Sequence, residues 1–90
     1  MSDAKEIEVY GMLLAVTRSL VDRPDDLKIT MASDQDSTVF TLEAHPSDLG
    51  KLIGSKGRTA RALRVIVSAN GARLKRHLGL NIVQAPESES

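Results

Sequence analysis

The chain has 90 residues, and its 12 lysines and arginines balance 12 aspartates and glutamates, for a formal net charge of +0 at pH 7. This length suits one domain with a single core, and a hydrophobic content of 41% argues against a disordered chain. The composition contains no cysteine, which excludes a disulfide framework and a thiolate metal site. The polar, acidic first residues are unlike a secretion signal, and the apolar run at 11–16 is too short to span a bilayer. We therefore expect a soluble cytoplasmic protein that does not act at a membrane.

The neutral total conceals an uneven distribution of charge. Between His45 and Gln84 there are eight basic residues and one acidic residue, Asp48, which gives this part a net charge of +7. The rest of the chain holds four basic and eleven acidic residues, a net charge of −7. Because binding follows the local potential rather than the total charge, the second half is predicted to bind an anion.

Residues 3 to about 22 are predicted to form an amphipathic helix. Asp3 can cap it, with Glu6 three residues later in a capping-box arrangement. Pro24 ends the helix, because the residue before a proline is disfavoured in the α conformation. Seven residues at three- and four-residue spacing are expected to form the buried stripe: Ile7, Tyr10, Leu13, Leu14, Thr17, Leu20 and Val21.

Two strands are predicted next. Residues 27–31 alternate between apolar and polar, and so do residues 38–44, which place Phe40, Leu42 and Ala44 on one face. The polar cluster at 33–37 suits a turn, so the two strands are expected to form a hairpin.

Two helices and a last strand complete the predicted order α-β-β-α-α-β. Pro46 and the two residues after it favour a helix start, and this short helix runs to Gly54. A second helix begins near Gly57, and the pair Asn70-Gly71 leaves its end open between 69 and 76. Residues 80–83 form a short final strand, and the acidic tail at 85–90 is expected to be disordered. The buried side of the second helix is expected to carry Ala60, Leu63, Ile66, Val67 and Leu74.

The stretch between these two helices, Gly54-Ser55-Lys56-Gly57, points to a ligand. Glycine permits positive φ and a close approach of another molecule, and the second helix offers unpaired N–H groups and its positive dipole end there. Ile53 and Ala60 can supply an apolar wall, while the following helix adds Arg58, Arg61 and Arg64. A glycine pair alone is usually just a tight corner, but this combination suits a nucleic-acid backbone crossing the loop, with bases in a shallow apolar groove.

These residues resemble a known family. The stretch HPSDLGKLIGSKGRTARALRVIVSA, residues 45–69, resembles the core of a KH domain, whose signature is an Ile-Gly-x-x-Gly loop between two helices. The element order is similar to the type II arrangement, and residues 5–84 resemble the small stand-alone bacterial KH proteins of the KhpA (YlqC-like) family. The motif typical of that family is met by Asp48, Gly50, Lys51, Ile53, Gly54, Gly57, Arg58, Thr59, Ala62, Leu63 and Arg64.

The resemblance implies one α+β domain over residues 1–84, a type II KH domain whose three-stranded mixed sheet has the helices packed on one face. It implies binding of single-stranded RNA, of which a KH loop clamps about four nucleotides. Relatives are RNA chaperones or post-transcriptional regulators linked to cell elongation and division. They form homodimers, or heterodimers with a larger Jag-like KH protein, and we expect neither enzyme activity nor a cofactor.

Nine residues in and around the loop are the candidate RNA-binding residues. The glycines permit the turn, the two residues between them donate hydrogen bonds and charge, and the basic residues hold phosphates. Arg64 has an internal ion pair as an alternative role, and Ile53 is divided between the core and the groove wall. The nine residues are Gly54, Ser55, Lys56, Gly57, Arg58, Arg61, Arg64, Lys51 and Ile53.

Other residues have weaker claims to a role in binding. Three basic residues further along, Arg73, Lys75 and Arg76, are as compatible with a solvated face. The two histidines are isolated from each other and from carboxylates, so no metal site is expected. The only aromatic residues, Tyr10 and Phe40, fall on predicted buried faces, which argues against base stacking on an aromatic platform.

The helix after the loop has more apolar surface than one small sheet needs. Val65 and its neighbours are therefore a candidate interface with a partner protein.

Three rival interpretations remain. A helix-turn-helix DNA-binding protein also has a basic helix after a turn, but its turn needs no second glycine and its recognition helix would carry base-reading side chains. A second rival is an enzyme with a P-loop, whose motif ends in Gly-Lys-Ser/Thr and follows a strand. Residues 50–57 lack this ending and follow a predicted helix. The third is a KH-shaped protein-interaction module that does not bind RNA.

Overall fold

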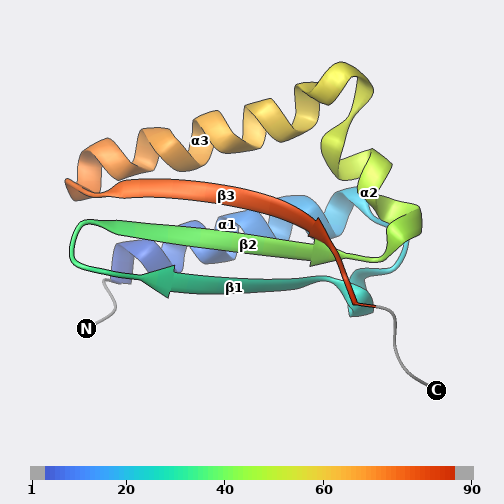
Figure 1. The fold of residues 1–90 in the computed structure, drawn as a ribbon, viewed down its shortest axis with the longest axis horizontal. Helices are drawn as coiled ribbons and strands as arrows, with labels where there is room; N and C mark the ends of the chain where they lie inside the picture. The colour runs from blue at the N-terminus through green and yellow to red at the C-terminus, as the bar shows by residue number, and fades with distance from the viewer. Residues whose placement is uncertain (1–3, 87–90) are drawn as a thin grey trace.

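The computed structural model describes residues 4–86 (Figure 1). Within this range the elements follow the predicted order α-β-β-α-α-β, with two short 3-10 turns, η1 (Pro24–Asp26) and η2 (Ser55–Gly57). The helices and strands are α1 (Ala4–Leu20), β1 (Lys28–Ser33), β2 (Ser37–Ala44), α2 (Pro46–Ile53), α3 (Arg58–Leu74) and β3 (His77–Gln84).

The three strands form one mixed sheet in the order β1-β2-β3. β1 and β2 are an antiparallel hairpin with Met31 opposite Phe40, and β3 runs parallel to β2 with Leu80 opposite Phe40. A parallel neighbour requires a crossover connection, which α2 and α3 provide. β3 is therefore an edge strand of the sheet, and α3 packs against it (Figure 1).

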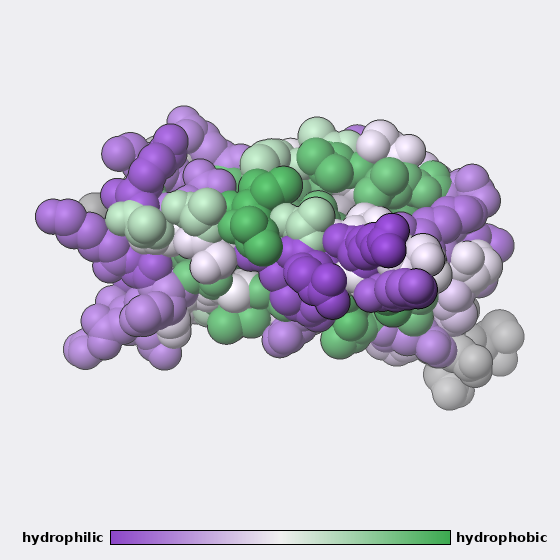
Figure 2. All heavy atoms as spheres, turned by 90° about the horizontal axis from the view of Figure 1, so that it is seen from above, coloured by the Kyte–Doolittle hydropathy of each residue, from purple (hydrophilic) through white to green (hydrophobic). Residues whose placement is uncertain are grey.

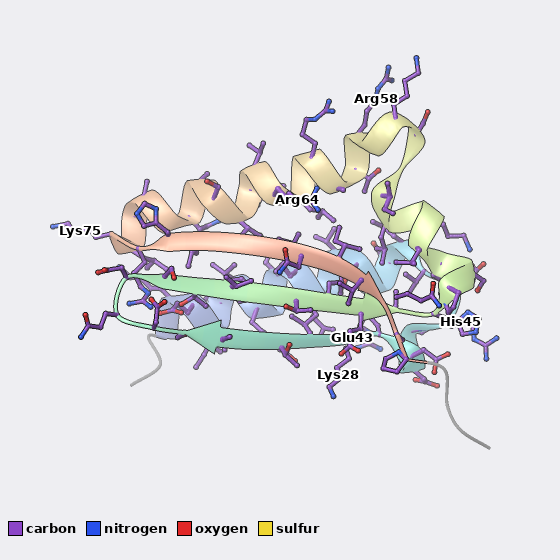
Figure 3. The ribbon with its side chains drawn as sticks, in the orientation of Figure 1. Lys28, Glu43, His45, Arg58, Arg64 and Lys75 are labelled. Carbon is purple, nitrogen blue, oxygen red and sulfur yellow. The ribbon has the colours of Figure 1, made fainter. Side chains whose placement is uncertain are left out.

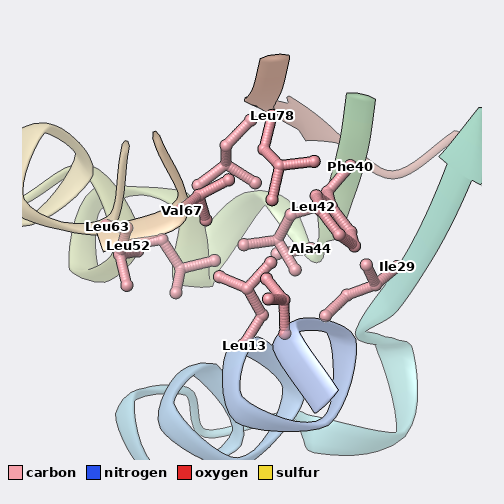
Figure 4. Packing of buried hydrophobic residues seen from close by; sticks show 11 residues of the cluster. Leu13, Ile29, Phe40, Leu42, Ala44, Leu52, Leu63, Val67 and Leu78 are labelled. Carbon is pink, nitrogen blue, oxygen red and sulfur yellow. The ribbon is translucent and has the colours of Figure 1, made fainter. Parts of the chain in front are cut away.

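One face of the sheet carries the hydrophobic core (Figure 4). Phe40, Leu42 and Ala44 are all buried on this face of β2, as the alternating pattern predicts. The three helices cover the same face, which confirms the α+β arrangement expected from the sequence. They contribute the buried side chains Val9, Leu13, Leu52, Leu63 and Val67.

The buried stripe of α1 differs from the prediction. Ile7, which was expected in the stripe, is 53% exposed, and Leu20 is exposed as well. The helix presents Glu6 to the sheet, because the carboxylate accepts a hydrogen bond from Thr38 at 2.6 Å. Glu6 therefore makes a buried contact with β2. The expected capping box also involves Asp3, which lies outside the described residues. The buried residues of α1 are Glu6, Val9, Leu13 and Thr17.

The strands at the edges differ from their predicted bounds. β3 begins at His77 instead of residue 80, because it pairs with β2 from Ser37 opposite His77 to Ala44 opposite Gln84. β1 starts one residue later than expected and continues to Ser33, opposite Thr38. Both extensions depend on pairing with β2, which short stretches of sequence do not reveal.

α3 continues through Asn70 and Gly71, which settles the boundary left open by the sequence. Gly71 is buried where the helix meets the turn into β3, and a Cβ there would lie 2.5 Å from the carbonyl oxygen of Arg76. Ile66 was expected in the core but is 44% exposed, so that prediction is wrong. It lies beside the buried line of the helix, which runs through Ala60, Leu63, Val67 and Gly71.

Arg76 connects the end of α3 to the rest of the fold. Its guanidinium donates hydrogen bonds of 2.6–2.9 Å to the carbonyl oxygens of Asp34, Gln35 and Ser37, in the turn between β1 and β2. Its Nε also lies 3.4 Å from Oε1 of Glu6. This arginine is consequently a structural residue and not part of a solvated face.

Few features remain outside these elements. Of the helices in residues 4–86, none has the length and apolar character needed to cross a membrane.

The N–H of Ala85 donates to the carbonyl oxygen of Ala44 at 2.8 Å, so the first residue of the expected tail continues the sheet contacts. Residues 87–90 of that tail lie outside the described part.

Candidate nucleic-acid interface

The loop between α2 and α3 is made of unusual backbone conformations. Gly54, Lys56 and Gly57 have φ values of 78°, 57° and 74°, all in the left-handed region. The N–H of Gly57 donates to the carbonyl oxygen of Gly54 at 3.1 Å, which closes the turn. A non-glycine residue at positive φ is uncommon, and the exposed Lys56 adopts this conformation between the two glycines.

Space as well as conformation requires glycine at position 54. A Cβ on Gly54 would lie 2.3 Å from Oγ1 of Thr59, whereas a Cβ on Gly57 would meet nothing within 4 Å. Among the described residues, no side chain caps the N-terminus of α3, which begins at Arg58 directly after the loop. The first N–H groups of a helix have no partner within the helix, so this end of α3 offers donors next to the loop.

Three arginines follow on α3 and have different surroundings. Arg58 points away from the sheet, whereas Arg64 lies between α3 and β3 (Figure 3). Arg58 and Arg61 border a shallow hollow of about 410 Å³ whose other lining residues are Ala62, Val65 and Ile66. In Figure 2, which looks down on α3 from above, hydrophobic and strongly hydrophilic side chains lie next to each other across this face.

A groove of about 500 Å³ lies beside the loop, between the helices and β3. Ile53 is 41% exposed and belongs to the wall of this groove, while its neighbour Leu52 is fully buried in the core. Nε–H of Arg64 donates to the carbonyl oxygen of Leu80 at 3.2 Å, which is a hydrogen bond to backbone rather than the internal ion pair considered above. The groove is lined by Ile53, Gly57, Ala60, Arg61, Arg64 and Ile82.

Lys51 differs from the other basic candidates, because its ammonium pairs with Asp22 and Asp48. These hydrogen bonds, first the one to Asp22 and then the one to Asp48, raise the pKa of Lys51 above its usual range. The structure therefore places seven of the nine candidates in the loop or the groove, and Arg58 follows the loop directly. It directs the charge of Lys51 toward two carboxylates.

Asp48 has a role that the sequence interpretation missed. Its side chain is 1% exposed and accepts hydrogen bonds from the backbone N–H groups of Asp22 at 3.1 Å and Arg23 at 3.0 Å. The N–H of Asp22 is the main cause that lowers the pKa of Asp48 below its ordinary value, against the opposing effect of burial. Asp48 thus fixes the start of α2 to the segment that follows α1, and it was recognisable as the single acidic residue in the basic half of the chain.

Comparisons with known proteins agree with this geometry. The family model described as KhpA/KhpB, KH domain matches residues 11–82. This chain belongs to the KhpA/KhpB family of KH domains. The exposed stretch Gly54–Gly57 has the Gly-x-x-Gly pattern of the loop with which KH domains clamp about four backbone nucleotides.

Named relatives come from several bacteria. The chain is 43% identical over 68 residues to the RNA-binding protein KhpA of Halalkalibacterium halodurans, covering 76% of this chain and 90% of the relative. It is 38% identical over 78 residues to the protein of the same name from Borreliella burgdorferi, covering 87% and 92%. It is 45% identical over 58 residues to that of Streptomyces coelicolor, covering 64% and 73%. No significant match to a solved structure was found.

Proposed function

We propose that this KH domain binds single-stranded RNA, with the sugar–phosphate backbone on the Gly54–Gly57 loop and the bases in the adjoining groove. The observation that carries this proposal is the position of an exposed, basic loop directly beside a groove lined by Ile53, Ala60 and Ile82. An unpaired strand has both an anionic backbone and flat apolar bases, and this surface offers a partner to each of them.

The loop provides the contacts to phosphate. Lys56 and Ser55 are exposed between the two glycines, and the N-terminal N–H groups of α3 lie next to them. Arg58 and Arg61 extend the positive charge along the first turns of α3, where they suit the neighbouring phosphates. Lys51 contributes less, because Asp22 and Asp48 already balance its charge.

The double substitution Ser55→Asp and Lys56→Asp tests this assignment. It places negative charge where the phosphates would lie, so we expect at least a tenfold loss of affinity for single-stranded RNA in a fluorescence anisotropy titration. The matched control is Ser68→Asp with Lys75→Asp, which makes the same change in charge at exposed positions further along α3 and after its end. Normal binding by the loop variant, or an equal loss in the control, would overturn the assignment.

The biological setting of this proposal follows the family. We assign the protein to the cytoplasm as an RNA chaperone or post-transcriptional regulator, with a link to cell elongation and division. The named relatives are RNA-binding proteins, which supports the first part of this assignment. The main rival, a helix-turn-helix DNA-binding protein, is tested by a competition titration between single-stranded RNA and duplex DNA. Tighter binding to the duplex DNA would favour that rival.

The outer face of α3 supports a partner interface as well. Val65 is 61% exposed, and with Ala62 and Ile66 it lines the hollow on the side away from the core. Burying such side chains against another protein is favourable, so we assign this face to a homodimer or to a heterodimer with a larger Jag-like KH protein.

Light scattering tests the homodimer. At tens of micromolar the protein should have the mass of a dimer, and Val65→Glu should reduce it to that of a monomer. Ile7→Glu is the control, because Ile7 is a similarly exposed apolar residue on a different helix. A monomeric mass for the unmodified protein would contradict self-association.

A further inference from the structure

The corner between α2 and α3 has little of its own to keep it in one shape. α2 ends at Ile53 and α3 begins at Arg58, so the chain turns sharply within residues 54–57 (Figure 1). The two residues between the glycines are exposed, and glycine has a wider choice of backbone conformations than any other residue. Fixing such a stretch costs conformational entropy, so a contact from a neighbouring residue is needed to restrict it.

Thr59 makes that contact at the first of the two glycines. A Cβ built on Gly54 would lie 2.3 Å from Oγ1 of Thr59, 2.8 Å from its Cβ and 2.9 Å from its backbone N. Thr59 therefore already occupies the space beside the Cα of Gly54. Threonine is branched at Cβ and has a stiff side chain, so the contact limits the conformations that Gly54 can adopt. Gly57 has no such neighbour, since a Cβ there would meet nothing within 4 Å.

Thr59 lies apart from the surface assigned to RNA. It is half-buried, and it lines neither the groove beside the loop nor the hollow on the outer face of α3. An effect of its side chain on RNA would therefore pass through the shape of the loop. We propose that Thr59 is a positioning residue, which holds Gly54 and so fixes Ser55 and Lys56 in place before RNA binds; this rests on the proposed binding of single-stranded RNA.

Two hydrogen bonds complete the restraint on the loop. The N–H of Gly54 donates to the carbonyl oxygen of Gly50 at 2.8 Å, and the N–H of Gly57 donates to that of Gly54 at 3.1 Å. Gly54 therefore takes part in both bonds and also carries the contact with Thr59, so a change in its backbone would move the rest of the loop. A loop that is ordered in advance binds more tightly, because the entropy of ordering it is not lost when the ligand binds.

Thr59→Ala and Thr59→Val together test this role. Alanine removes the side-chain atoms beyond Cβ but favours a helix more than threonine does, so the variant should unfold at the same temperature as the unmodified protein or higher. Its affinity for single-stranded RNA should nevertheless fall roughly fivefold in a fluorescence anisotropy titration, because the loop must then be ordered on binding. Thr59→Val should stay within about twofold of the unmodified protein, since valine keeps the branched shape. Valine has no hydroxyl, so this variant also excludes a direct hydrogen bond from Thr59 to RNA as the cause.

Thr41→Ala is the matched control, because Thr41 is a half-buried threonine that alternates with the core residues of β2 and so lies on the other face of the sheet. It should bind RNA as the unmodified protein does. Nitrogen-15 relaxation of the free proteins should show the amides of Ser55 and Lys56 to be more mobile in Thr59→Ala than in the unmodified protein or Thr59→Val.

Three results would overturn this inference. They are full RNA affinity in Thr59→Ala, an equal loss of affinity in Thr59→Val, and loop amides that are as mobile in the unmodified protein as in Thr59→Ala. An unmodified protein that does not bind single-stranded RNA would instead overturn the proposed function.

Discussion

The two glycines of the loop are needed for different physical reasons. Gly54 combines positive φ with contact against Thr59, while Gly57 has positive φ and open space around the position of a Cβ. The sequence could predict that both positions favour glycine, since the pattern Gly-x-x-Gly is local. It could not predict the contact with Thr59, which depends on how α3 begins.

Gly54→Ala and Gly57→Ala should therefore differ in their cost. Alanine at 57 adds only the strain of a left-handed residue, about 1 kcal/mol in the free energy of unfolding. Alanine at 54 adds the same strain and also a Cβ 2.3 Å from Oγ1 of Thr59, so its loss of stability should be larger and α3 should shift at its start. Urea denaturation of both variants measures the difference. Equal stabilities would contradict the packing described for Gly54.

The lowered pKa of Asp48 predicts that the stability of the fold depends on pH. Its pKa in the folded protein is below the ordinary value of 3.8, mainly because of the N–H of Asp22. A lowered pKa means that Asp48 stabilises the fold above its unfolded pKa and that this contribution is lost as the pH falls through its folded pKa. Asp48→Asn should lower the urea midpoint at pH 7, and its difference from the unmodified protein should shrink as the pH falls below about 3.8. A difference independent of pH would show that the charge is not involved.

Most contacts that define the site join residues far apart in the chain. Asp48 meets the N–H groups of Asp22 and Arg23, and Arg64 meets the carbonyl of Leu80. Sequence patterns could place Asp48 and Arg64 in a motif, but they could not reveal these partners because nothing local encodes them. For the same reason Lys51 was predicted as a binding residue, although two carboxylates lie next to its ammonium.

Helices and strands were predicted best where their patterns are local. The bounds of α2 and the buried face of β2 match the sequence expectation, because Pro46 marks a start and β2 alternates strictly. The buried stripe of α1 was predicted only in part: Leu13 and Thr17 are buried as expected, but Ile7 and Leu20 are exposed. Glu6, which was expected in a capping box, faces the sheet instead of solvent. The length of β3 depends on its pairing with β2, so a pattern search found only its middle.

Glycines within α1 and α3 differ in the space around them, so substituting each by alanine should have opposite effects on stability. A Cβ on Gly11 in α1 would meet nothing within 4 Å, so Gly11→Ala should raise the free energy of unfolding by about 1 kcal/mol through helix propensity. Gly71→Ala has the same gain in propensity, but its Cβ would lie 2.5 Å from the carbonyl oxygen of Arg76. The clash should outweigh the gain, and thermal unfolding should show Gly71→Ala to be less stable than the unmodified protein. Stabilisation by both substitutions would contradict the close packing at the end of α3.

The fold divides the basic half of the chain into two groups. Lys56 and the arginines at 58, 61 and 64 surround the loop and the groove. At the other end of α3, Lys75 and Arg76 share a hollow with Asp36, and Arg76 is bound to the turn between β1 and β2. The count of +7 therefore overstates the charge of the site, since the acidic turn offsets the second group. The end with the loop is the one suited to an anionic strand.

The central claim is that RNA binds at the end of α3 that carries the loop. A nuclear magnetic resonance titration with single-stranded RNA tests this claim most directly. We expect the largest changes in amide chemical shift at Gly54–Gly57, with further changes at Ala60 and Ile82 in the groove. Amides near Gly71 and His77, at the opposite end of α3, should change little. Changes concentrated at Gly71 and His77 and absent from the loop would contradict the account.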